Sequence, residues 1–237
     1  MSPKQRVDQQ PAFVLHARPW RETSLVVELL TRDHGRVAVV AKGARRPLSA
    51  LRSVLMGFQP LLADWSGSGE VKTLIRAERD GFQRLLEGRA LLCGYYLNEL
   101  VVHLSAREDP HPGVFEAYVA AVAALAGNPE PAPVLRRFEL ALLRELGYGV
   151  ELEHEAGGGA PVEAGTRYAY IIERGPVRGG EGGVPVTGRT LLALGQEDFS
   201  DTRTLSEAKA LLRMLINHHL GGRDLQSRRV FKELQEL

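Results

Sequence analysis

The sequence predicts an α+β protein: a small N-terminal β-barrel followed by a mainly α-helical domain that carries a glycine-rich β insertion. Three observations support this prediction. Segments with strand patterning crowd into the first eighty residues, the apolar spacing becomes helical after Asp80, and a glycine-rich stretch at about 150–186 interrupts the helices. A chain of 237 residues is long enough for two small cores, so we expect domains at 1–80 and 81–237.

The first eighty residues contain strand candidates at about 12–18, 24–31, 36–42, 57–65 and 71–79. Asp33-His34-Gly35 supplies turn chemistry between the second and third, and Ser66-Gly67-Ser68-Gly69 does so between the last two. The longer link at 43–56 has room for a short helix at 50–54. Short strands with one helix-bearing connection fit a closed barrel of the oligonucleotide-binding (OB) type, with an SH3-like barrel as the rival.

Helices are expected after the barrel. The apolar spacing predicts a long helix from Phe82 to about Ala106, ended by a proline-rich break. Two further helices at 114–126 and 134–146 each end at a glycine. After the insertion, whose β-like run is 167–172, a capping box beginning at Thr204 predicts a helix to Leu220, and a last helix starts near Leu225.

Positive charge is concentrated at the N-terminal end of the chain. Residues 1–80 hold thirteen Lys and Arg against eight Asp and Glu, whereas the rest of the chain has an acidic excess and the whole has a net charge of only +1. A cationic face raises the local concentration of polyanions. This asymmetry therefore favours a polyanionic partner for the predicted barrel.

One loop gathers much of this charge. Lys42-Gly43-Ala44-Arg45-Arg46 places three cations within five residues where the chain leaves the third strand, and Arg18, Arg21, Arg36 and Lys72 fall near other strand ends. Such a set suits a phosphate backbone, although a solvated loop kept soluble by its charge is equally compatible with the five residues alone. We expect the primary phosphate contacts at Lys42, Arg45 and Arg46, with the four other cations as secondary contacts.

Aromatic residues lie among these cations. Trp20 stands between Arg18 and Arg21, an arrangement that single-strand binders use for base stacking beside phosphate neutralisation. Phe13, Phe58 and Trp65 are expected to fill the barrel instead. No base-reading pattern is visible, so binding should tolerate any sequence and weaken with salt.

The motifs of several enzyme classes are absent. The sequence has no Gly-Lys dipeptide of a phosphate-binding loop, no nucleophile-elbow serine and no His-Glu-x-x-His, and it has a single cysteine, Cys93, in an apolar helical setting. His154 lies among Glu151, Glu153 and Glu155 but lacks thiolate partners, so we expect a solvated acidic run there. We therefore expect no enzymatic activity, no metal and no other cofactor. We also expect a cytosolic protein, because no apolar run is long enough to span a membrane.

Several motifs in order resemble the bacterial RecO family of DNA repair proteins. They cover nearly the whole chain and read Ala12-Phe13-Val14-Leu15, Arg18-Pro19-Trp20-x-Glu22-Thr23-Ser24-Leu25, Gly35-Arg36-Val37, Ala41-Lys42-Gly43-Ala44-Arg45, Gly69-Glu70-Val71-Lys72-Thr73-Leu74, Tyr96-x-Asn98-Glu99-Leu100, Leu135 to Leu143 followed by Leu146-Gly147-Tyr148-Gly149, and Leu225-Gln226-Ser227-Arg228.

The resemblance implies a recombination mediator rather than an enzyme. Such a protein binds single- and double-stranded DNA, anneals complementary strands, and works with RecR to load RecA onto DNA coated by single-strand-binding protein. It implies a location in the bacterial cytoplasm with the nucleoid. Many members carry a four-cysteine zinc element in the insertion, which has no cysteine here, so the insertion is expected to fold without metal on the packing of Tyr168, Tyr170 and Ile171.

A second implied partner is the acidic C-terminal tail of single-strand-binding protein. Its terminal phenylalanine needs an apolar slot rimmed by arginine, for which we expect Arg136, Arg137, Phe138 and Leu140. An RNA-binding OB protein of ribosome assembly or translation fits the barrel and its charge almost as well. A hydrolase with an unrecognised site is the third alternative.

Overall fold

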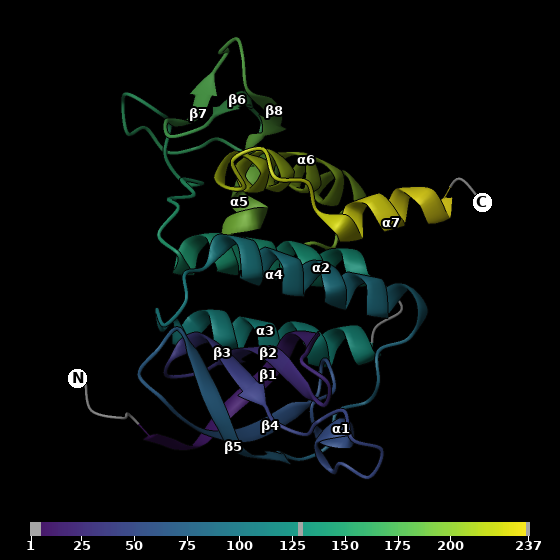
Figure 1. Ribbon diagram of the computed structural model, residues 1–237. Coiled ribbons are helices and arrows are strands. Elements are labelled where there is room, and N and C mark those ends of the chain that lie inside the picture. The colour runs from purple at the N-terminus through teal and green to yellow at the C-terminus, as the bar shows by residue number, and fades with distance from the viewer. Residues whose placement is uncertain (1–5, 128–129, 236–237) are drawn as a thin grey trace. The chain divides into compact units, whose positions relative to one another are not determined.

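The computed structural model describes residues 6–127 and 130–235 (Figure 1). The chain forms two compact units: unit 1 comprises Met1–Asn128 and Leu225–Leu237, and unit 2 comprises Pro129–Asp224. Unit 1 therefore contains the barrel together with helices that the sequence assigned to the second domain. The boundary expected at residue 80 stays a prediction about folding units.

The barrel is closed by five strands in the order β1-β2-β3-β5-β4. The bounds are β1 Arg6–Trp20, β2 Ser24–Thr31, β3 Gly35–Ala41, β4 Pro60–Ser66 and β5 Val71–Arg79, with the short helix α1 Leu51–Val54 between β3 and β4. Strand β1 pairs with both β2 and β4, and β3 pairs with β5 in parallel. The fold class is thus the predicted one, with an OB-like barrel at the N-terminal end.

Strand β1 is longer than its sequence pattern suggested. Its pairing is broken by register shifts between Val7 and Gln10 and between Val14 and His16. At the first shift Gln9 has φ 53° and donates its backbone N–H to Asp64 at 2.6 Å. A bulge interrupts the alternation of side chains between the two faces of a strand, so the residues before Pro11 did not show a strand pattern in the sequence.

The barrel interior holds small and branched apolar side chains. Trp65 fills the interior as expected, together with Val14, Val27, Leu29, Val39 and Leu61. Phe13 and Phe58 are buried elsewhere, and the expectation that they fill the barrel was wrong. The Phe13 ring packs against Tyr118 with centroids 5.2 Å apart, and Phe58 packs against Tyr95 at 5.4 Å, so both face helices outside the barrel.

Three helices complete unit 1: α2 Gly88–Leu104, α3 Pro112–Gly127 and α7 Gln226–Gln235. Helix α2 packs on β1, α3 and α7. Its buried face includes Cys93, as expected, and Gly94, where a Cβ would lie 2.7 Å from the Phe58 ring. Helix α2 begins at Gly88, six residues later than predicted, and the preceding residues, among which Phe82 is exposed, are not helical.

Unit 2 consists of α4 Pro131–Glu145, a three-stranded sheet, α5 Gly188–Gly195 and α6 Thr202–His219. The sheet has the order β7-β6-β8, formed by β6 Arg167–Ile171, β7 Gly175–Arg178 and β8 Val184–Thr187. Helix α6 packs on α4, α5 and β8. The sequence pattern did not predict helix α5, because eight residues bounded by glycines are too few to show a helical spacing of apolar residues.

The start of α6 corrects the predicted capping box. Asp201, not Thr204, is the N-cap, and its carboxylate accepts the Thr204 N–H at 2.8 Å. Glu207 instead accepts from the Thr187 and Thr190 hydroxyls, both at 2.7 Å. The carboxylate expected to cap its own helix therefore joins α6 to the β8–α5 connection.

Polar contacts join the parts of the β insertion. Tyr168 donates its hydroxyl to Glu155 at 2.9 Å, and Arg178 contacts both Glu155 at 2.7 Å and Glu163 at 3.0 Å. Tyr168 and Tyr170 are buried, and burial raises the pKa of Tyr170 to about 12. The insertion therefore combines the expected aromatic packing with an ion-pair network that the sequence pattern did not show.

Candidate nucleic-acid interface

The loop after β3 is fixed to the turn between β1 and β2. Ala44 is fully buried in the barrel core, which pins the loop from inside. Arg45 donates its backbone N–H to the Thr23 carbonyl at 2.8 Å, and its guanidinium donates to the Glu22 carbonyl at 3.2 Å. Gly43 has φ 70°, which a glycine adopts without strain. The two connections thus form one end of the barrel.

This end gathers six of the eight residues expected to contact DNA. We call it the basic end and define it by residues that are all exposed: Arg18, Trp20, Arg21, Lys42, Arg45 and Arg46. The pairing of Trp20 with Ser24 and of Leu25 with Ala41 places the strand ends side by side. Trp20 is 43% exposed, so part of its ring is available for stacking.

The side chains of the basic end are largely uncommitted. Within the part of the chain that the structure describes, Arg18, Arg21, Lys42 and Arg46 form no ion pair or side-chain hydrogen bond with a carboxylate. Among residues 6–127 and 130–235, Arg45 donates only to backbone carbonyls. Their positive charge is therefore not neutralised by the fold, as an anion-binding surface requires.

The other two expected cations have structural partners. Lys72 is 8% exposed and lies 2.8 Å from Glu108, with its ammonium also donating to the Gly69 carbonyl at 2.7 Å. Arg36 lies 2.6 Å from Glu28 and donates to the Ser105 carbonyl at 2.7 Å. Neither belongs to the basic end, and we remove both from the proposed interface.

Arg36 is part of a charged triad. Glu28 accepts from Arg36 on one side and from Arg107 on the other at 2.8 Å. Burial lowers the pKa of Arg36, partly opposed by the charge of Glu28, whereas the hydrogen bond that Arg107 donates to Glu28 raises the pKa of Arg107. Because the arginines outnumber the carboxylate, the triad keeps one net positive charge while it fastens the β2–β3 hairpin to the segment after α2.

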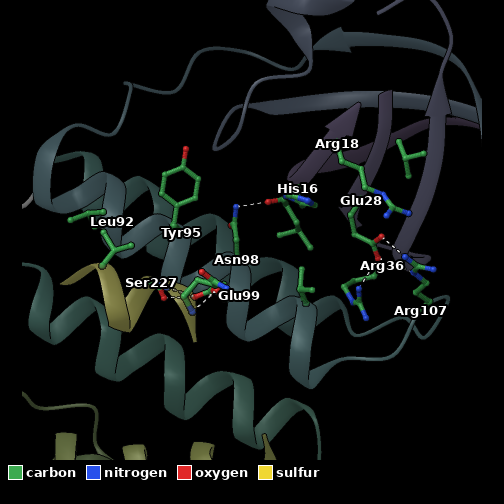
Figure 2. Close-up of a pocket in the computed structure, with 15 residues that line it drawn as sticks. His16, Arg18, Glu28, Arg36, Leu92, Tyr95, Asn98, Glu99, Arg107 and Ser227 are labelled. Carbon is green, nitrogen blue, oxygen red and sulfur yellow. Dashed lines mark hydrogen bonds and ion pairs between the residues drawn. The ribbon is translucent and has the colours of Figure 1, made fainter. Parts of the chain in front are cut away.

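A groove of about 600 Å³ borders this triad (Figure 2). Figure 2 shows Arg18, Glu28, Arg36 and Arg107 on one side and Leu92, Tyr95, Glu99 and Ser227 on the other. Its walls come from β1, β2, β3, α2 and α7, and much of the lining is apolar. Arg18 belongs to both the groove and the basic end, so the two surfaces are continuous.

Asn98 and Glu99 form the polar floor of the groove. Asn98 donates to the Leu15 carbonyl at 2.9 Å and accepts from the Tyr118 hydroxyl at 2.7 Å. Glu99 accepts the first backbone N–H groups of α7, from Gln226 at 2.9 Å and Ser227 at 2.8 Å. These two side chains are thus used to hold β1, α3 and α7 around α2.

The residues expected to bind an acidic tail are only partly accessible. Phe138 and Leu140 are buried in unit 2, and the expectation that they line an open slot does not fit this placement. Arg136 is 7% exposed and pairs with Glu139 at 2.5 Å, although its Nε has no hydrogen-bond partner among the described residues. Arg137 is exposed, and its guanidinium lies 5.5 Å from the centre of the Phe199 ring.

Comparison with known proteins shows which family the chain resembles. The family model described as "Recombination protein O N terminal" matches residues 5–80, and "Recombination protein O C terminal" matches residues 85–229. The chain belongs to the RecO family. It is 67% identical to the DNA repair protein RecO of Aromatoleum aromaticum and 61% identical to that of Azoarcus sp., with full coverage of both chains in each case. The RecO protein of Dechloromonas aromatica is 54% identical, also at full coverage.

Membership of the RecO family agrees with the barrel and supports a role in DNA repair and recombination. In residues 6–127 and 130–235 no three His, Cys, Asp or Glu side chains converge in a way that could hold a metal ion. In the same residues no helix is both long and apolar enough to cross a bilayer.

Sequence reasoning missed two features of this RecO-family chain. The groove draws its walls from segments as far apart in the chain as Leu15 and Val230, and no local pattern signals it. Leu48, at the tip of the loop after the basic run, is 100% exposed. Its neighbours Arg46 and Pro47 could have indicated a turn that projects it, because proline at the second position favours a β-turn.

Proposed function

We propose that this protein is a non-catalytic recombination mediator that binds single- and double-stranded DNA through the basic end of its barrel. It anneals complementary strands and helps RecR load RecA onto DNA coated by single-strand-binding protein. The observation that carries the proposal is the gathering of exposed, uncommitted cations and Trp20 on two connections that the fold ties together. Membership of the RecO family supports DNA rather than another polyanion.

The electrostatics of the basic end explain annealing. Two complementary strands repel each other through their phosphates, and cations that neutralise both lower that repulsion. Contacts to phosphates leave the base edges free to pair. A cationic surface without base-reading pockets therefore favours strand pairing while it requires no chemical step.

The direct test is triple charge reversal of Lys42, Arg45 and Arg46 to Glu. Each lost phosphate contact flattens the dependence of log K on log salt by about one, so we expect the slope to fall by about two to three and affinity at low salt to drop at least about a hundredfold. The measurement is oligonucleotide titration at several salt concentrations. A structured RNA that outcompetes single-stranded DNA would favour an RNA-binding function instead.

A matched control applies the same charge change to unit 2. Arg167, Arg174 and Arg189 are exposed there, and their reversal to Glu alters net charge equally without touching the basic end. We expect this variant to keep the salt slope of the parent protein. Equal losses in both triple variants would mean that net charge, not the basic end, governs binding.

We further propose that the acidic tail of single-strand-binding protein binds at Arg136 and Arg137. The exposed guanidinium of Arg137 is the donor that a peptide can reach, whereas Arg136 is buried and paired with Glu139. Phe138 and Leu140 contribute by supporting α4 from the core rather than by touching the peptide.

Arg137→Glu tests this site at a residue whose side chain is exposed. We expect it to weaken binding of a tail peptide at least about tenfold, because a charge-assisted contact becomes a repulsion. Affinity for naked DNA should change less than about twofold. Unchanged peptide affinity, measured by fluorescence anisotropy, would exclude Arg137 from the tail site.

A further inference from the structure

We propose that Leu48 is a wedge that enters between neighbouring bases of a bound single strand, which rests on the proposed DNA-binding function. Leu48 is 100% exposed, so the fold gains nothing from its apolar side chain. Single exposed leucines are common, and exposure alone would not support a function. The geometry of the segment around Leu48 supplies the argument.

Leu48 occupies the tip of a rigid turn. Ser49 donates its N–H to the Arg46 carbonyl at 3.0 Å, which closes a β-turn with Pro47 and Leu48 as its central residues. The φ of Leu48 is not positive, which excludes a type II turn and makes this a type I turn. Type I turns favour proline at their second position, which Pro47 occupies here. The backbone that presents the side chain is therefore preset before any ligand binds.

The turn is anchored in the barrel core on both sides. Ala44 precedes it and is fully buried, and Leu55 follows it after α1 and belongs to the same core cluster. The position of the tip is consequently constrained by the barrel core on both sides of the turn. Proteins that unstack bases use such wedges, with leucine and proline among the residues that serve.

Cations lie next to the wedge in the chain. Arg46 is the first residue of the turn and Arg45 precedes it, and both are exposed members of the basic end. A strand held by its phosphates at these arginines has its bases next to the turn. Unstacking costs least in single strands, so the wedge favours a single strand over a continuous duplex.

The experiment places 2-aminopurine at each central position of a 12-nucleotide single strand in turn and measures its fluorescence in the saturated complex. Unstacking of this base raises its fluorescence. We expect a rise at one or two positions with the parent protein and with Leu48→Met, which keeps an apolar wedge. Leu48→Gln should abolish the rise, weaken binding less than about fivefold, and keep the salt slope.

Leu85→Gln is the matched control, because Leu85 is half exposed and lies outside the basic end. It should behave like the parent protein. A rise that persists in Leu48→Gln would overturn the wedge, and so would a parent complex that binds tightly without any rise. Failure of DNA binding itself, or a triple reversal without effect, would instead overturn the proposed function.

Discussion

Asn98 shows how one buried amide can hold three elements together. It is 5% exposed on α2, donates to the Leu15 carbonyl of β1, and accepts from Tyr118 of α3. Leu15 lies at the second bulge of β1, where its carbonyl is turned out of the regular ladder. The amide therefore satisfies a backbone group that the bulge would otherwise leave buried without a partner.

Asn98→Leu should destabilise unit 1 by about 2–4 kcal/mol, because it removes both hydrogen bonds and places an apolar side chain against the buried Leu15 carbonyl. The protein has two tryptophans, Trp20 and Trp65, and both lie in the barrel, so urea unfolding followed by tryptophan fluorescence reports on unit 1. Tyr118→Phe, which leaves the Leu15 contact in place, should cost less. Equal losses in the two variants would contradict the bridging role.

At the residue scale, sequence reading placed exposed cations better than paired ones. Arg45 and Arg46 follow a strand in a polar run, and local context alone predicted their exposure. Lys72 looked similar, yet its partner Glu108 lies thirty-six residues further along the chain, at a distance that no local pattern reaches. Whether a cation is free thus depends on tertiary contacts.

At the scale of elements, Glu207 joins α6 to the connection between β8 and α5. Burial of this carboxylate opposes its ionisation, but hydrogen bonds from Thr187, Thr190 and Arg203 outweigh that cost and lower its pKa to about 2. The folded pKa lies below the ordinary value of 4.5. Its contribution to stability is therefore present above pH 4.5 and lost as the pH falls toward 2.

Glu207→Gln should lower the stability of unit 2 by about 1–2 kcal/mol at pH 7, since solvent screens a partly exposed carboxylate. The difference between the variant and the parent protein should shrink steadily as the pH is lowered from 4.5. Thermal unfolding followed by circular dichroism between pH 3 and pH 7 provides the measurement. A gap that stays constant over this range would show that the charge of Glu207 does not matter.

The elements themselves were largely predictable, and their failures have physical causes. The positions of α3, α4 and α6 were found within three residues, because glycines mark the ends of the first two and a polar capping segment marks the start of the third. Strands β7 and β8 were not resolved, because four residues each among glycines carry no alternation. Phe13 and Phe58 were expected inside the barrel but pack against helices, because a helix outside a barrel can bury an aromatic ring as well as the barrel interior can.

At the scale of the molecule, unit 1 is assembled from both ends of the sequence. Helix α7 packs on α2, with Leu225 buried and the first N–H groups of α7 received by Glu99. Arg228 adds a contact, with its guanidinium 5.5 Å from the centre of the Tyr96 ring. The barrel and α2 are therefore stabilised by residues that follow unit 2 in the chain.

Deletion of residues 225–237 should consequently destabilise the barrel, although it removes no barrel residue. We expect a loss of about 2–4 kcal/mol in the transition followed by tryptophan fluorescence, because the deletion uncovers the apolar face of α2 and leaves Glu99 without its helix. Glu99→Gln should reproduce about a third of this loss by weakening the contact to the start of α7 alone. A fluorescence transition unchanged by the deletion would show that unit 1 folds without its C-terminal segment.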